Sequence, residues 1–217
     1  MESPIASYTA SPPSTYTLPE ANDKALRNAK TIHETMVRTV CELRPAAVFE
    51  IGSGAGVVGS AIASQGIRYA GIEPDPTSLA TCRREHPDLN VVPASCYDEP
   101  YSLGLGKFDL VLSNDVIEHV YEPRRFVTFA RAHLNAGGKF VCCTPDYGNY
   151  WRNLLLSLFN KWDHHHAVLW DGGHIKFFSK STLSTVLSEG GFGDFKWRTI
   201  HDTHGLPMSI CCVATAI

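Results

Sequence analysis

The residues best placed to do chemistry form a glycine-rich run, Glu50-Ile51-Gly52-Ser53-Gly54-Ala55-Gly56, which follows a short apolar segment. Glycines permit a tight turn with unusual dihedral angles and let the backbone approach a ligand closely. The helix that we expect behind this run would present free N–H groups at its first turn. The pattern therefore predicts a ligand-binding turn between a buried strand and a helix.

Two carboxylates narrow the choice of ligand. Glu73 follows the next apolar run, where an acid can accept hydrogen bonds from ribose hydroxyls, and this fits NAD and S-adenosylmethionine equally. Glu50 stands beside the turn, where a carboxylate disfavours a phosphate and favours an ammonium group. The spacing G-x-G-x-G also differs from the dinucleotide pattern G-x-G-x-x-G, although Gly59 supplies a longer variant. These features favour S-adenosylmethionine, with an NAD-linked dehydrogenase as the alternative.

A second polar group follows the fourth apolar run. Glu118 and His119 come three and four residues after Asp115, so on a helix the three side chains would share one face. There they could meet around a metal ion, or they could hold the helix and the cofactor loop by hydrogen bonds. The second interpretation is the simpler one, and we expect no bound metal.

Further histidines lie later in the chain. His174, between Gly173 and Ile175, could take a proton from a substrate hydroxyl, because the usual pKa of histidine is near 7. It could equally tie an insertion to the sheet. His164 and His166 would share a face of an extended segment and could bind a metal, but a polar loop is the simpler interpretation.

Apolar runs alternate with helical patterns along most of the chain, and this predicts a doubly wound α/β fold with a ligand crevice at the carboxyl ends of its strands. We expect a mostly parallel, seven-stranded sheet with helices on both faces and an antiparallel last strand. The predicted strands are 46–51, 69–72, 89–92, 108–113, 139–143, 192–199 and 209–217. The predicted helices are 22–43, 57–64, 77–85, 123–134, 151–159 and 182–188.

Length and composition suit one domain over residues 22–217, preceded by a flexible arm at 1–21 that is rich in Ser, Thr, Pro and Ala. A substrate-side insertion or lid is expected at about 145–178. Its apolar run at 151–159 is either a helix packed on the domain or a lid or dimer contact. The net charge of −3 offers no basic field for nucleic acid.

The seven cysteines include no C-x-x-C pair, so we expect buried apolar thiols in a reducing compartment. No apolar stretch is long enough for a membrane span. These features predict a cytoplasmic protein, either a monomer or a homodimer.

Several stretches together resemble the class I S-adenosylmethionine-dependent methyltransferases, within them the ubiquinone-biosynthesis O-methyltransferases and other small-molecule methyltransferases. The matching stretches are VFEIGSGAG, YAGIEPD, FDLVLSNDVIEHV with a following EPRRF, LNAGGKFVCCTPD and GGHIKFFSKSTLSTVLSEGGF. They span about residues 47–192.

The resemblance implies a set of cofactor contacts. The methionine end of S-adenosylmethionine would be lined by Glu50, Gly52, Ser53, Gly54 and Gly56. Glu73 would hold the ribose hydroxyls, and Pro74 would lie near the adenine. Ser95 and Cys96 would contact the adenine, although many relatives carry an acid there. Asn114 and Asp115 would lie beside the transferred methyl group. In the ubiquinone-type relatives, the segment with Glu118 and His119 is associated with a divalent ion.

The resemblance implies methyl transfer to a small-molecule acceptor, with S-adenosylhomocysteine as the other product. O-methylation of an apolar or aromatic acceptor is favoured, with His174, His119 or Asp115 as catalytic groups. The alternatives are N-methylation of a small amine or peptide, a dehydrogenase, and a binding module without turnover.

Overall fold

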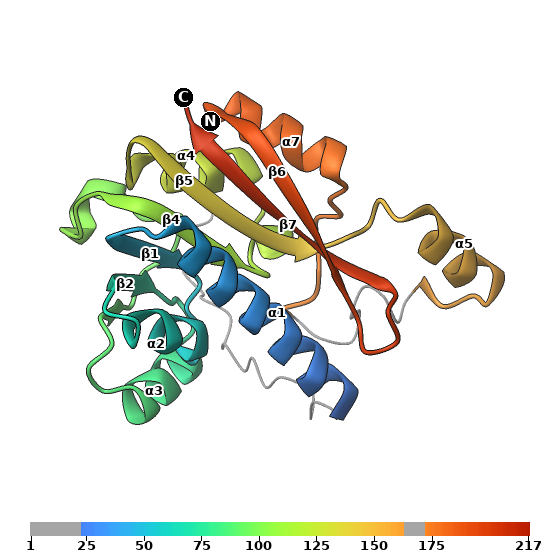
Figure 1. The fold of residues 1–217 in the computed structure, drawn as a ribbon, viewed down its shortest axis with the longest axis horizontal. Helices are drawn as coiled ribbons and strands as arrows, with labels where there is room; N and C mark the ends of the chain where they lie inside the picture. The colour runs from blue at the N-terminus through green and yellow to red at the C-terminus, as the bar shows by residue number, and fades with distance from the viewer. Residues whose placement is uncertain (1–22, 163–171) are drawn as a thin grey trace, which may run out of the picture.

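The computed structural model describes residues 23–162 and 172–217, and these form one seven-stranded sheet in the order β3-β2-β1-β4-β5-β7-β6 (Figure 1). The strands are β1 (Ala47–Ile51), β2 (Arg68–Ile72), β3 (Val91–Val92), β4 (Phe108–Asn114), β5 (Leu134–Pro145), β6 (Phe192–His201) and β7 (Pro207–Ala216). Strands β1 to β5 pair in parallel, whereas β7 runs antiparallel to both β5 and β6. The predicted fold class, with its antiparallel last strand, is confirmed.

Helices cover both faces of the sheet (Figure 1). They are α1 (Asp23–Leu43), α2 (Val57–Ala63), α3 (Pro76–Glu85), α4 (Pro123–Ala132), α5 (Tyr150–Leu158) and α7 (Lys180–Glu189), with short 3₁₀ turns η1 (Pro100–Leu103) and η2 (Ile117–His119). Met36 of α1 and Ile62 of α2 belong to one buried apolar cluster, and Phe126 of α4 and Leu183 of α7 belong to another. Two cores therefore hold the sheet between two helical layers, and α5 contributes to neither.

Most element boundaries lie within two residues of the prediction, and the start of β5 differs by more. β5 begins at Leu134 rather than at residue 139, because Leu134 already pairs with Phe108 before the register shifts. β3 begins at Val91 rather than at residue 89, because the chain before it turns, with the amide of Val91 donating to the carbonyl of Leu89. The central strands match their predicted ranges closely, because parallel strands that are buried on both faces appear in the sequence as continuous apolar runs.

Four sequence predictions concern the arm, the histidine run, the cysteines and membrane spans. The arm at 1–21 and the run His164 to His166 lie outside the described residues. Six of the seven cysteines are buried, and all seven are free thiols. Over the described ranges, no helix has the length and apolar character that crossing a membrane requires.

Candidate active site

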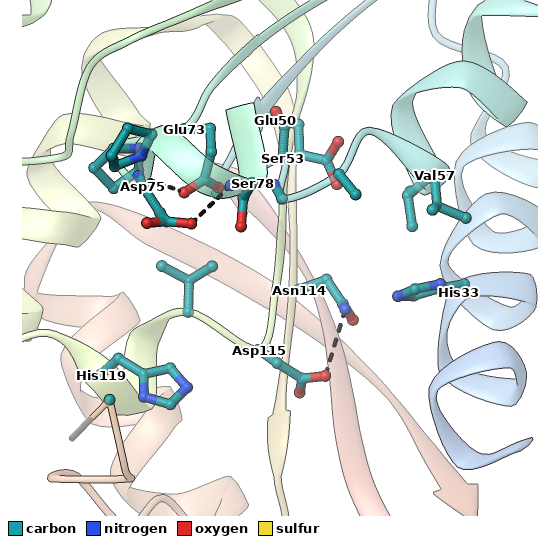
Figure 2. Close-up of a pocket in the computed structure, with 18 of the residues that line it drawn as sticks. His33, Glu50, Ser53, Val57, Glu73, Asp75, Ser78, Asn114, Asp115 and His119 are labelled. Carbon is teal, nitrogen blue, oxygen red and sulfur yellow. Dashed lines mark hydrogen bonds between the residues drawn. The ribbon is translucent and has the colours of Figure 1, made fainter. Parts of the chain in front are cut away.

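A cavity of about 600 Å³ opens where β1, β2 and β4 end, the edge at which a doubly wound sheet places its ligand. Its far wall is lined by His119 of η2, which Figure 2 shows, and by Gly172, Gly173 and Ile175. Its lining includes His33, Glu50, Gly52, Ser53, Gly54, Val57, Glu73, Pro74, Asp75, Ser78, Asn114, Asp115, His119, Tyr121, Gly173 and Ile175.

The glycine turn is held against β2 by its own backbone. The amides of Gly52 and Ser53 both donate to the carbonyl of Ile72, each at 3.0 Å. Gly52 has a φ of +79°, and a Cβ there would lie 2.5 Å from the side chain of Val116. Gly54 also has a positive φ, of +54°, but a Cβ on it would meet no atom within 4 Å. The turn therefore leaves open space beside Gly54 for a ligand to approach the backbone.

Glu73, at the end of β2, connects the glycine turn with the start of α3. Its carboxylate accepts hydrogen bonds of 2.8 Å from the amide of Gly54 and from the amide of Asp75. Asp75 in turn caps α3 by accepting from the amide of Ser78 at 2.7 Å. Burial raises the pKa of Glu73 above its usual value, and the two backbone hydrogen bonds oppose that rise. The carboxylate is thus fixed in position before any ligand arrives.

Glu50 is almost fully buried at the end of β1, 2% exposed. The hydroxyl of Tyr69 donates to its carboxylate and also lies 2.9 Å from the hydroxyl of Ser53. Burial raises the pKa of Glu50 to about 7, the hydrogen bond from Tyr69 opposes this rise, and the charge of Glu73 adds to it. A cation beside Glu50 would favour its ionised form.

The end of β4 presents two polar side chains to the cavity (Figure 2). Asn114 donates a 3.4 Å hydrogen bond to Asp115, whose backbone has a φ of +51°. Burial raises the pKa of Asp115 to about 7. Within the described part of the chain, one buried oxygen each of Asp75, Asn114 and Asp115 has no hydrogen-bond partner.

The polar groups that line the cavity suit S-adenosylmethionine. The four carboxylates of its lining are those of Glu50, Glu73, Asp75 and Asp115, and its described lining contains no lysine or arginine. The unpartnered oxygens can accept from ribose hydroxyls or an ammonium group, and the acidic field favours a sulfonium. The residues present fit this cofactor.

A buried acid, Glu118, and a second histidine, His174, lie close to His119 of the far wall. Glu118 is fully buried and accepts a 2.9 Å hydrogen bond from Thr144. Its pKa is raised well above the usual value by burial and by the charge of Asp115. One ligand atom each of Glu118, His119 and His174 lies within 4.8 Å of the others, close enough for a cation, and our expectation of no bound metal stays a prediction.

The prediction that Asp115, Glu118 and His119 share one face of an α-helix is wrong. Asp115 has left-handed backbone, and the next residues form the 3₁₀ turn η2 instead of an α-helix. Only Asp115 and His119 of the three line the cavity, while Glu118 points into the protein toward Thr144. The third member of the close group is His174, which also contacts the hydroxyl of Tyr147.

The predicted cofactor contacts divide into two groups. The cavity lining includes Glu50, Gly52, Ser53, Gly54, Glu73, Pro74, Asn114 and Asp115. Gly56, Ser95 and Cys96 are not among the lining residues. A Cβ on Gly56 would lie 2.6 Å from the sulfur of Cys82, so this glycine serves helix packing, and Cys96 belongs to the apolar core. The roles of these residues stay predictions.

Sequence reasoning missed His33, Tyr69 and Tyr147. His33 of α1 lines the cavity opposite Asn114 (Figure 2), and burial lowers its pKa. Tyr69 and Tyr147 stand behind Glu50 and His174. Their positions depend on contacts between segments distant in the chain, so no local pattern indicated them.

Comparison with known proteins identifies the family. The family model described as a methyltransferase domain matches residues 23–194. The chain belongs to the methyltransferase domain family. This confirms the predicted enzyme class, a class I methyltransferase with S-adenosylmethionine as cofactor, and it decides against the NAD-linked dehydrogenase.

The relatives differ in how much they share with this methyltransferase. The ubiquinone biosynthesis O-methyltransferase of Methylobacterium sp. (strain 4-46) is 32% identical over 98 residues, which are 44% of this chain and 39% of that protein. An uncharacterized methyltransferase of Mycobacteroides abscessus is 34% identical over 87 residues, 38% of this chain and 33% of that protein. The methyltransferase thus spans well under half the length of these curated relatives.

Solved structures share the fold at low identity. The magnesium protoporphyrin IX methyltransferase of Synechocystis, solved with bound S-adenosylhomocysteine, superposes with a TM-score of 0.69 at 13% identity over 93% of this chain and 91% of that chain. A possible histamine N-methyltransferase of Thermotoga maritima gives a TM-score of 0.63 at 20% identity over 88% of this chain and 91% of that chain. These likenesses support the architecture.

Proposed function

We propose that this methyltransferase transfers the methyl group of S-adenosylmethionine to an oxygen atom of a small acceptor with an apolar or aromatic body. The observation that carries the proposal is the placement of His119, which lines the cavity on the side of Asp115 (Figure 2). Burial lowers the pKa of His119, so its imidazole is neutral at neutral pH. A neutral imidazole beside the reacting atoms is suited to take the proton of a hydroxyl.

The cofactor brings an electrophilic methyl group on a sulfonium, and the protein's part is to hold it in line with the acceptor. Glu73 would accept from the ribose hydroxyls, since it is already oriented by two backbone amides. Glu50 and the open backbone at Gly54 would receive the methionine end. Asn114 and Asp115 would lie beside the sulfonium at the end of β4.

The surroundings of His119 favour one tautomer. We infer that Nδ1 carries the proton, because it lies 3.4 Å from the carbonyl oxygen of Gly173, which can only accept. Its Nε2 atom then has a lone pair, and it lies 4.0 Å from the carboxyl of Glu118. We assign Nε2 of His119 as the proton acceptor, with His174 behind it in a supporting position.

N-methylation of a small amine is the second candidate. The acidic lining of the cavity favours it, because carboxylates attract a cationic amine as well as the sulfonium. An O-methyltransferase needs the base at His119, whereas a neutral amine needs little help with deprotonation. The two candidates therefore predict different effects of removing His119.

Calorimetric titration with S-adenosylmethionine and S-adenosylhomocysteine, with NADH as the control, tests the cofactor site. Phenols, carboxylic acids and amines are then offered with S-adenosylmethionine, and methylated products are detected by mass. Methylated phenols or acids support the proposal, and products from amines alone replace it with the second candidate. Cofactor binding without any product would favour a binding module.

A further inference from the structure

A groove of about 520 Å³ adjoins the cavity of the candidate active site, and Tyr121 lines both. The groove is formed by residues 121–125, around the start of α4, and by residues 176–178 and Thr182, around the start of α7. Ile175 lines the cavity and the next residue, Lys176, lines the groove. The amides of these two residues both donate to the carbonyl of Glu118, at 2.9 and 3.0 Å, so the junction is fixed on η2.

The groove and the cavity carry opposite charges. The described lining of the groove contains three cations, Arg124, Arg125 and Lys176, and one acid, Glu122. The described lining of the cavity contains four carboxylates and no lysine or arginine. Since the whole chain has a net charge of −3, the groove is a local reversal of sign. A molecule that spans both would therefore be oriented, with any anionic group repelled by the cavity and attracted to the groove.

The three cations differ in how far they are already neutralised. The guanidinium of Arg124 is paired with Glu189, with its Nε atom 2.7 Å from the carboxylate. A guanidinium nitrogen of Arg125 lies 4.0 Å from the carboxylate of Glu122. Lys176 is partly buried, and it forms no ion pair within residues 23–162 and 172–217. The ammonium of Lys176 is thus the charge that is left to pair with a ligand, and one unpaired cation matches a group with one negative charge.

Aromatic side chains line the groove beside this charge. Phe177 is 52% exposed, and its ring packs edge-on against Tyr147 with the ring centroids 4.9 Å apart. Tyr121, at the junction with the cavity, is 77% exposed. Phe178 is buried and belongs to the apolar core, which anchors the segment that carries Lys176. Aromatic surfaces with one placed charge are suited to a flat apolar body that ends in a charged group.

A nucleic acid fits the groove less well. Binding to a phosphate backbone needs a series of cations that each neutralise a phosphate. Two of the three cations of the groove already face acids of the protein, and Lys176 alone offers no such series. The charge and the size of the groove favour a small molecule with a single anionic group.

We propose that the groove binds a carboxylate of the methyl acceptor through Lys176, so that the substrates are aromatic hydroxy acids. The inference rests on the proposed function for the position of the reacting hydroxyl. That hydroxyl enters the cavity, its oxygen takes the methyl group from the sulfonium, and its proton goes to Nε2 of His119. The carboxylate itself is not methylated, because the acidic lining of the cavity keeps it in the groove.

Matched pairs of phenols test this assignment. Hydroxycinnamates and hydroxyphenylpropanoates of each ring position are compared with their primary amides, which keep the ring and the hydroxyl but lack the charge. Calorimetry with the full chain saturated in S-adenosylhomocysteine gives the affinity of each compound without any turnover. With S-adenosylmethionine, mild alkaline hydrolysis separates methyl esters from methyl ethers among the products.

We expect carboxylates to bind more tightly than their amides, with the preference weakened by added salt. Lys176→Gln should reduce this preference about tenfold, the loss of one hydrogen bond to a charged group. Lys196→Gln, at an exposed lysine of β6, is the matched control and should retain the preference. Circular dichroism and binding of S-adenosylhomocysteine report the fold of both variants.

The proposal would be overturned by equal affinity within every pair, by the absence of carboxylate binding across the series, by methyl esters as products, or by an unchanged preference in Lys176→Gln. Its failure is distinct from failure of the proposed function. Carboxylate binding that depends on Lys176, without methyl ethers, would support the groove and refute O-methylation. Methyl ethers formed from neutral phenols, without a preference for carboxylates, would refute the groove and support O-methylation.

Discussion

The hydroxyl of Tyr69 donates a hydrogen bond to the carboxylate of Glu50, and both side chains are buried behind the glycine turn. The same hydroxyl lies 2.9 Å from Ser53, so one phenol connects the end of β1 with the turn that follows it. Gly59 leaves room for the ring, because a Cβ there would lie 2.4 Å from it. The hydrogen bond from Tyr69 therefore favours the ionised form of Glu50 and lowers its pKa.

Glu50→Gln should remove a pH dependence of stability. Burial raises the pKa of Glu50 from 4.5 to about 7, so between these values the folded protein holds a proton that the unfolded chain has released. This contribution is fully present below pH 4.5 and is lost as the pH rises to 7, by about 3 kcal/mol. Urea denaturation at about pH 5 and about pH 8 should show a larger fall in unfolding free energy for the wild type than for the Glu50→Gln variant.

The comparison isolates Glu50 because both proteins retain Asp115, whose pKa is also raised by burial to about 7. Glutamine keeps an oxygen that can accept from Tyr69, so packing is preserved. An identical pH dependence in the two proteins would show that Glu50 is not protonated in the folded state.

Tyr69→Phe should destabilise the protein by about 1–3 kcal/mol, because the buried Glu50 loses its donor while the ring still fills its space. The loss should be larger at high pH, where Glu50 is ionised and needs the hydrogen bond more. Tyr101→Phe, at a side chain that is 81% exposed, is the control and should leave the unfolding free energy unchanged. Equal stability of the two variants would mean that the phenol hydroxyl contributes nothing to Glu50.

The central sheet and the glycine turn were predictable because their signals are local. A buried parallel strand reads as an apolar run, and a turn with positive φ at Gly52 and Gly54 requires glycine. The order Glu50, turn, helix and Glu73 then places both carboxylates at one edge of the sheet. Chain order and strand polarity suffice for that part of the site.

The rest of the site depends on contacts that no local pattern encodes. Tyr69 looks like an ordinary strand residue, and only the register of β1 with β2 brings its hydroxyl to Glu50. His33 lies on α1. The apolar pattern of α1 specifies which face of the helix is buried, but it does not indicate that His33 lies near the cavity. The contact of α5 with the sheet includes a hydrogen bond from Arg152 to the carbonyl of Pro207, 55 residues away in the chain.

Gly54→Val should abolish binding of S-adenosylhomocysteine while the protein stays folded. Its side chain would occupy the open space beside the turn, which contains no protein atom within 4 Å of a Cβ. Gly66→Val is a matched control, because Gly66 also has a positive φ, of +77°, and open space, but it does not line the cavity. Calorimetry should show binding for the control alone, with similar circular dichroism for both variants. Unchanged affinity in Gly54→Val would remove the turn from the cofactor site.

His119→Asn should lower turnover on a hydroxyl acceptor by about 10²–10⁴, because it removes the group assigned to take the proton. The affinity for S-adenosylhomocysteine should stay the same, since asparagine can still donate to the carbonyl of Gly173. Burial lowers the pKa of His119 below its usual 6.5, so wild-type kcat should rise with pH through a value under 6.5 and then level off. The variant should lack this rise, and His201→Asn, at an exposed histidine, should keep it. Full turnover in His119→Asn on a phenol would contradict a base at this position, whereas unchanged turnover confined to amines would favour N-methylation.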